Sequence, residues 1–289
     1  MNRRSFAKTL GAVSLAALPA KKIHAQEGNE EKEFMGILVD TTMCVGCRGC
    51  EEACAEVNGF PEPDPDDSVL EKERKTSITQ YSVINRYEVD DEEIFVKKQC
   101  MHCNQPACAS ACLTKAMLKR EEGPVIWRED KCMGCRFCMV SCPFDIPKFE
   151  YDEWNPKIQK CNMCWERLKE GEQPACVEAC PAEAIIFGKR KDLIEEAKQR
   201  IYTNTDDYVH HIYGEHEVGG TGYLYLSAVP FDKIGFRTDL GTTPYPEYTQ
   251  DFLYGVPIVL ALWPPLLLAL SNATKRDDEP NKDGGFSEN

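Results

Sequence analysis

The sequence predicts an α+β fold in which a cysteine-rich body is followed by one C-terminal transmembrane helix. Three observations predict it. Sixteen cysteines form four groups of four, short apolar runs typical of strands lie between and after these groups, and one long apolar run lies near the C-terminus. The body, residues 26–240, is long enough for one large domain.

The four cysteine groups share one spacing pattern. Three groups read C-x2-C, then two or four residues, then C-x3-C, and the last keeps both ends around a gap of eleven residues. This is the spacing of bacterial ferredoxins, in which three thiolates on a loop hold one 4Fe-4S cluster and the fourth ligates a neighbouring cluster. The groups are Cys44, Cys47, Cys50 and Cys54; Cys100, Cys103, Cys108 and Cys112; Cys132, Cys135, Cys138 and Cys142; and Cys161, Cys164, Cys176 and Cys180.

Disulfides and zinc are the two competing interpretations of these cysteines. A disulfide framework suits short secreted domains, and closely spaced C-x2-C pairs make poor structural disulfides. Zinc ribbons use two C-x2-C pairs for each ion and need no third cysteine followed by x3-C-P. Cys142-Pro143 and Cys180-Pro181 carry this ending, although Cys54 and Cys112 lack it. The pattern favours iron–sulfur clusters.

Residues 1–25 predict export. Arg3-Arg4, an apolar stretch from Leu10 to Leu18 and a cleavage site after Ala25 form a twin-arginine signal peptide. A cytosolic leader with a chance Arg-Arg pair is the alternative. Twin-arginine export moves proteins that are already folded around their cofactors, so the thiolates would be bound to iron before they reach an oxidising compartment. We therefore expect a periplasmic protein.

A transmembrane helix is predicted over residues 252–271. This run contains no charge, and its twenty residues at about 1.5 Å each span about 30 Å, the thickness of a hydrocarbon core. Lys275 and Arg276 follow it, which places the C-terminus on the cytoplasmic side of a single-pass anchor. Pro257 and the Pro264-Pro265 pair leave a buried or interfacial hairpin as the alternative. Residues 241–251 would be a linker and 272–289 a disordered tail.

The net charge excludes a nucleic-acid partner. The formal charge is −14, and cleavage after Ala25 removes five basic residues and no acidic residue, which leaves −19. Phosphate backbones would be repelled by this charge.

Between the cysteine groups, the patterns predict short strands and one helix. We expect a hairpin over 78–87 and 94–97, a turn and strand over 123–127, strands over 184–188 and 223–226, and an amphipathic helix over 191–200. Adjacent cysteine groups could pair into two-cluster modules, or the pairing could be nested, with first joined to fourth and second to third. Spacing alone leaves both open.

Residues 34–230 resemble a known family. The order of the four groups, with C-x2-C-x4-C-x3-C second and the long-gapped group last, is similar to that of the four-cluster electron-transfer (beta) subunits of molybdopterin oxidoreductases and certain NiFe hydrogenases. Residues 39–47, 97–103 and 213–221 most resemble the hydrogenase-associated members.

This resemblance implies two nested bacterial-ferredoxin-like modules and four 4Fe-4S clusters. In the implied ligation, each fourth cysteine crosses to the partner group. The clusters would be held by Cys44, Cys47, Cys50 and Cys180; by Cys54, Cys161, Cys164 and Cys176; by Cys100, Cys103, Cys108 and Cys142; and by Cys112, Cys132, Cys135 and Cys138.

The resemblance further implies a non-catalytic subunit that relays electrons. The implied partners are a NiFe uptake hydrogenase and an NrfD-like integral membrane subunit that reacts with quinone. A molybdenum enzyme, such as a formate dehydrogenase, and a stand-alone tethered ferredoxin are the alternatives. No nucleophile–base pair or nucleotide-binding loop stands out in the sequence. His102 is interpreted as a solvated histidine, with tuning of a nearby cluster as the alternative, and His210, His211 and His216 as surface or packing residues.

Overall fold

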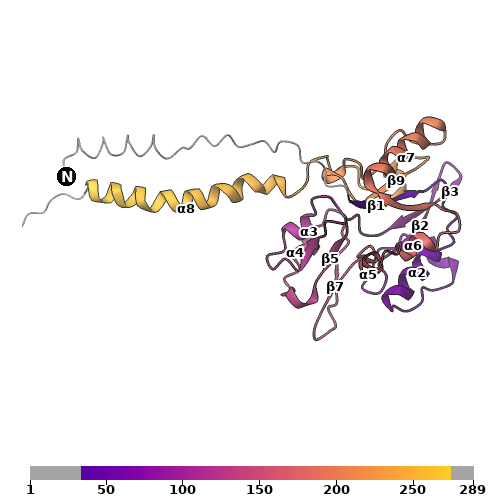
Figure 1. The fold of residues 1–289 in the computed structure, drawn as a ribbon, viewed down its shortest axis with the longest axis horizontal. Helices are drawn as coiled ribbons and strands as arrows, with labels where there is room; N and C mark the ends of the chain where they lie inside the picture. The colour runs from indigo at the N-terminus through magenta and orange to yellow at the C-terminus, as the bar shows by residue number, and fades with distance from the viewer. Residues whose placement is uncertain (1–33, 275–289) are drawn as a thin grey trace, which may run out of the picture. The chain divides into compact units, whose positions relative to one another are not determined.

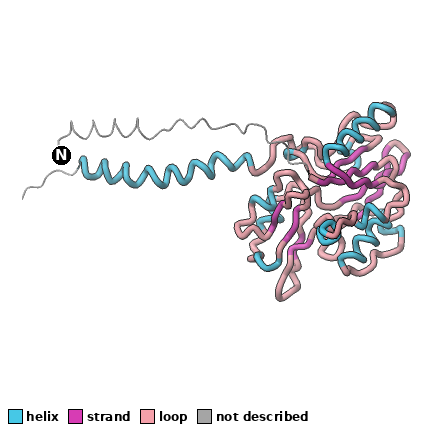
Figure 2. Tube along the Cα trace, viewed as in Figure 1, coloured by secondary structure: helices cyan, strands magenta, loops and turns pink. Residues whose placement is uncertain are grey.

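The computed structural model describes residues 34–274 (Figures 1 and 2). The predicted signal peptide (1–25) and tail residues 275–289 lie outside the described residues. The chain divides into a body, within Glu30–Tyr248, and a second unit that includes residues 249–274. In chain order the helices and strands are β1 (Met35–Asp40), α2 (Gly49–Asn58), η1 (Asp67–Glu71), β2 (Val83–Val89), β3 (Glu92–Lys98), α3 (Ala107–Ser110), β4 (Met117–Lys119), β5 (Val125–Trp127), η2 (Glu129–Lys131), α4 (Phe137–Ser141), β6 (Lys148–Phe149), β7 (Ile158–Gln159), α5 (Trp165–Lys169), α6 (Ala175–Glu178), β8 (Ile185–Lys189), α7 (Arg190–Thr203), η3 (Glu217–Gly219), β9 (Tyr223–Leu226), η4 (Phe231–Ile234) and α8 (Glu247–Thr274).

A three-stranded sheet of order β8-β1-β9 is buried on both faces. β1 runs antiparallel to β8 and parallel to β9. Because side chains alternate along a strand, Leu38 packs with Leu193 of α7, whereas Ile37 and Val39 pack in the opposite core with Cys50. The predicted strands 184–188 and 223–226 and the predicted helix 191–200 are thus confirmed, with bounds shifted by a few residues.

The tyrosines of β9 share the face that carries the cysteines. Leu224 and Leu226 pack with the α7 side, and Tyr223 and Tyr225 lie in the opposite core. All four side chains are fully buried. The period-two pattern of this strand therefore directs two phenol groups toward the cysteine-rich side of the sheet.

The predicted hairpin after the first cysteine group is also present. β2 and β3 pair antiparallel from Val83–Lys98 to Val89–Glu92. Asp90 and Asp91 connect the strands with φ of 54° and 68°. Two successive positive φ values are typical of a type I′ turn, which matches the twist of the strands. The first strand begins at Val83 and not at the predicted residue 78.

The backbone brings the outer cysteine groups, the first and the fourth, next to each other. β1 precedes the first group, and it pairs with β8, which follows the fourth. α2 of the first group packs against α6 of the fourth. The inner groups, the second and the third, meet in the same way: β4 pairs with β5, and α3 packs against α4.

α8 is one continuous helix and does not form a hairpin. It begins at Glu247, inside the predicted linker, and includes Pro257, Pro264 and Pro265. An acidic residue in the first turn favours a helix start at this point. By its length and composition α8 is compatible with a membrane span, and none of its residues is buried.

Candidate metal centres

The four C-x2-C loops share one backbone feature. The residue before the second cysteine of each loop has a positive φ: 70° at Gly46, 49° at His102, 69° at Gly134 and 56° at Met163. Turns that include this conformation direct successive backbone N–H groups into a concavity that binds anions, as at many iron–sulfur sites. Glycine adopts the conformation without strain, whereas His102 and Met163 are held in it by almost complete burial.

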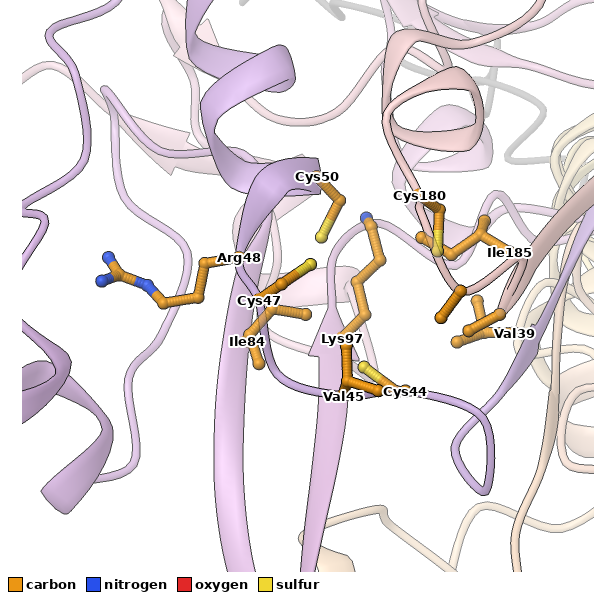
Figure 3. Close-up of a pocket in the computed structure, with 12 residues that line it drawn as sticks. Val39, Cys44, Val45, Cys47, Arg48, Cys50, Ile84, Lys97, Cys180 and Ile185 are labelled. Atoms are coloured by element: carbon orange, nitrogen blue, oxygen red, sulfur yellow. The ribbon is translucent and has the colours of Figure 1, made fainter.

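Cysteines from both outer groups line a first cavity of about 390 Å³. Figure 3 shows Cys47 and Cys50 of the first group on one side of Lys97, Cys180 of the fourth group on the other, and Cys44 of the first group below them. The remaining wall is apolar and includes Val39, Ile84 and Ile185. These four cysteines are the ligand set that the family resemblance implies.

A second cavity, of about 330 Å³, lies between the same two groups. Cys161, Cys164 and Cys176 of the fourth group line it together with Cys54 of the first. Each outer group thus contributes its last cysteine to the cavity of the other group. Helix α2 explains the contribution of the first group, because Cys50 and Cys54 lie one helical turn apart and line different cavities.

The inner groups form a third cavity, of about 310 Å³, with the same exchange. Cys132, Cys135 and Cys138 of the third group line it with Cys112 of the second. Met117 and Ile158 complete an apolar wall.

The remaining four cysteines lie close to one another. Burial raises the pKa of the Cys103 thiol well above its usual value, and the neighbouring charges of Cys100, Cys142 and Cys108 raise it further. The structure therefore brings Cys142 of the third group to the second group. The sixteen predicted site residues thus lie in four neighbourhoods of four cysteines each, and their ligation of clusters stays a prediction.

The geometry of these sets differs from that of a site for a single metal ion. A zinc site requires every sulfur atom to lie about 2.3 Å from one point. In the described part of the chain, no three His, Cys, Asp or Glu side chains converge closely enough to hold one ion. All sixteen cysteines are free thiols, so no disulfide occupies them. Three of the four sets line a cavity, as the ligands of a polynuclear group do.

Unpaired polar atoms at the cavities provide a second test of fit. Ser82 and Tyr223 line the second cavity and Trp127 lines the third. Their Oγ, hydroxyl and Nε1 atoms are buried and have no hydrogen-bond partner. A buried donor without a partner costs about 1–3 kcal/mol. Sulfur atoms of a bound cluster would accept these bonds, so the residues present fit a 4Fe-4S group.

Burial raises the pKa of the cysteine thiols, whereas hydrogen bonds from backbone N–H groups lower it. Burial raises the pKa of Cys138 and Cys142 to about 11. Burial also disfavours the Cys112 thiolate, but N–H groups, first that of Met117 at 3.3 Å from Sγ, outweigh it and lower the pKa of Cys112. Iron must displace the protons of the buried thiols, so its binding releases protons.

The interpretation of His102 as a solvated residue is wrong. Its side chain is 0% exposed, its Nδ1 accepts a 2.8 Å hydrogen bond from the backbone N–H of Val125, and its ring stacks on Tyr223. Burial lowers the pKa of His102 well below its usual value, helped by the charge of Lys160. Strands β5 and β9, distant in sequence, cover the ring. His210, His211 and His216 are exposed, as predicted.

Several residues at the cavities were not predicted as site residues. Lys97 lines both the first and the second cavity, although lysine is rarely buried. Tyr223 and Trp127 were assigned to strands without a role at the site. The available signal was the alternation Tyr-Leu-Tyr-Leu, which places both tyrosines on one face of β9.

Comparison with known proteins identifies the family. Residues 92–190, which contain the last three cysteine groups, match the 4Fe-4S dicluster domain family. The hydrogenase-2 operon protein HybA of Escherichia coli O157:H7 is 36% identical over 99% of this chain and 98% of its own length. The chain belongs to the ferredoxin-type electron-transfer subunits. The predicted resemblance is confirmed.

Two further relatives of this ferredoxin-type subunit are 30% and 47% identical to it. The iron-sulfur subunit of formate dehydrogenase-O from Escherichia coli K12 is 30% identical over 84% of the chain and 80% of its own length. A protein of Nitratidesulfovibrio vulgaris is 47% identical over 96% of the chain and 78% of its own length. HybA homologues and formate dehydrogenase subunits thus share the sequence pattern of this chain.

Proposed function

We propose that this ferredoxin-type subunit relays electrons between a catalytic NiFe uptake hydrogenase and a quinone-reactive, NrfD-like membrane subunit. The observation that carries the proposal is the convergence of distant cysteines, such as Cys44 and Cys180, around a shared cavity with a largely apolar wall. The body would lie on the periplasmic side of the cytoplasmic membrane.

The proposed cofactors are four 4Fe-4S clusters with nested ligation. This count is supported by four cysteine sets that each combine three residues of one group with the last residue of its partner group. Anaerobically purified protein should contain sixteen irons per chain. An iron content that corresponds to two or three clusters would contradict the count.

The chain itself would hold and insulate the clusters. When bound, 4Fe-4S clusters supply one-electron transfer. The thiolates would fix their positions, the apolar walls with Ile84 and Ile185 would keep water out, and Tyr223 and Trp127 would donate hydrogen bonds that stabilise negative charge on sulfur. In this proposal all sixteen cysteines would hold the four clusters, so none would be left to ligate a catalytic metal. The proposed role is therefore non-catalytic.

The proposed anchor is α8. It is long and apolar enough to cross a membrane, and Lys275-Arg276 follow its end in the sequence. A reporter enzyme that works only in the cytoplasm should be active when it is fused after Arg276. Activity of a periplasmic reporter at the same position would contradict the orientation, and the same fusion after residue 240 is the matched control for an exported body.

The choice of hydrogenase is supported by the extent of similarity. The HybA relative aligns with nearly the whole chain, whereas the formate dehydrogenase relative aligns with 84% of it. The second candidate is a molybdopterin enzyme of the formate dehydrogenase type. Gentle isolation of the membrane complex and metal analysis distinguish the two: nickel supports the hydrogenase, molybdenum or tungsten supports the second candidate, and the absence of all three indicates a stand-alone ferredoxin.

A further inference from the structure

Lys97 carries a positive charge into the middle of the outer cysteine groups. It lies on β3, its side chain is 1% exposed, and it lines both the first and the second cavity. In Figure 3 the side chain extends between the cysteines of the first cavity, with its nitrogen on the side of Cys50 and Cys180. Arg48, the other cation in this view, points away and pairs with Glu51.

The ammonium group of Lys97 has no anionic partner among the described carboxylates. Within residues 34–274, Nζ donates one hydrogen bond, to the neutral Oε1 of Gln99 at 2.9 Å. The ring of Tyr223 lies 5.7 Å from Nζ and adds a cation–π contact. A fully buried charge with so little compensation is costly unless an anion occupies the adjoining space.

Lys97 lies beside thiols of both cavities. Cys44 and Cys50 line the first cavity together with Lys97, and Cys54, Cys161 and Cys164 line the second together with Lys97. One side chain is therefore placed next to two cysteine sets at once.

Three hydrogen bonds hold Lys97 in this place. The Tyr225 hydroxyl donates to the carbonyl oxygen of Lys97 at 2.9 Å and accepts from Nε2 of Gln99, whose Oε1 accepts from Nζ. Gln99 and Tyr225 are themselves buried. Because β9 supplies Tyr225, the last strand of the sheet positions a charge that is carried by β3.

We infer that Lys97 is a shared counter-cation for the two clusters proposed for the outer cysteine groups and that it raises the reduction potential of both. The inference rests on the proposed function. A cluster with four thiolate ligands is anionic and gains one more negative charge on reduction, so a fixed cation beside it stabilises the reduced form more than the oxidised form. Lys97 is thus a positioning and tuning residue and not a ligand.

Lys160 is a second buried lysine and provides a comparison. Its side chain is 4% exposed, and its Nζ donates to the carbonyl oxygens of Val125 and Cys161. Lys160 lines neither the first nor the second cavity, so its neutral variant should affect the two outer clusters less than a neutral variant of Lys97.

The test is a potentiometric titration of the full-length, iron-loaded protein, followed by electron paramagnetic resonance. Lys97→Met removes the charge and keeps a chain of similar length, Lys97→Arg keeps the charge, and Lys160→Met is the comparison. We expect Lys97→Met to shift the midpoints of two signals to more negative potentials, Lys97→Arg to leave them near those of the wild type, and Lys160→Met to shift these two signals less than Lys97→Met does.

Unchanged midpoints in Lys97→Met at full iron content would overturn the inference and leave the proposed function intact. A downward shift in Lys97→Arg equal to that in Lys97→Met would also overturn it, because size and not charge would then be responsible. If Lys97→Met does not accumulate, Lys97→Arg decides: retained midpoints support the inference and a downward shift contradicts it. Wild-type protein without iron–sulfur signals would instead refute the proposed function.

Discussion

The hydroxyl of Tyr225 on β9 donates a 2.9 Å hydrogen bond to the carbonyl oxygen of Lys97 on β3. Tyr225→Phe removes this bond and also the hydroxyl that accepts a hydrogen bond from Nε2 of Gln99. Both changes leave buried polar groups without a partner. We expect the variant to lose about 1–3 kcal/mol of stability. The thermal unfolding midpoint of the iron-loaded protein should therefore fall. Tyr202→Phe, at an 80% exposed position, is the control and should change little.

Glu51 is a buried carboxylate between two guanidinium groups. It pairs with Arg48 at 3.2 Å and with Arg74, and it accepts hydrogen bonds from Gln80 and from the backbone N–H of Ile84. Glu51→Gln leaves the buried Arg48 and the partly buried Arg74 without their anion and should destabilise the body by about 3–5 kcal/mol.

The neighbouring acid provides the control for Glu51. Glu52 lies on the same helix, α2, and is exposed. Glu52→Gln should therefore keep the denaturation midpoint of the wild type within about 0.5 kcal/mol. Equal losses in the two variants would show that the buried network does not contribute to stability.

Double cysteine variants test nested ligation. Cys47 and Cys180 line the first cavity, so Cys47→Ser and Cys180→Ser should weaken the same electron paramagnetic resonance signal. The double variant should lose no more than one cluster. Cys135→Ser, in the third cavity, should affect a different signal. If Cys180→Ser affected the signal lost in Cys135→Ser, adjacent pairing of the third and fourth groups would be correct.

An ion pair near the surface gives a pH dependence of stability. His211 Nε2 lies 2.7 Å from Glu217, and this hydrogen bond raises the pKa of His211, with Glu215 adding to the effect. A raised histidine pKa contributes stability below the unfolded value of about 6.5, and the contribution is lost as pH rises through the folded pKa. The side chain is 46% exposed, so solvent screening limits the effect to under about 1 kcal/mol.

The measurement for His211 compares two pH values. His211→Gln should lower the unfolding midpoint more at pH values near 5.5 than near 8.5. His210→Gln, at an exposed position whose ring bonds only a backbone carbonyl, is the control and should give the same small change at both. A larger loss for His211→Gln at the higher pH would contradict the assignment of the ion pair.

The cysteine spacing by itself determined the kind of site. Ligation by C-x2-C-x2-C needs only residues close in sequence, so the loop at Cys44–Cys50 could be predicted without a fold. The hairpin at Asp90-Asp91, the helix α7 and the apolar run of α8 were also predicted, because local periodicity determines them.

Tertiary structure alone decided which groups meet and what lies between them. Cys180 reaches Cys44 because β8 pairs with β1, and such long-range strand pairing leaves no local pattern in the sequence. The burial of Lys97 and His102 likewise depends on β9, which pairs in parallel with β1 after a long connection. The sequence determined the ligands, and the fold determined their partners and the charge placed between them, because burial and electrostatics depend on distances in space.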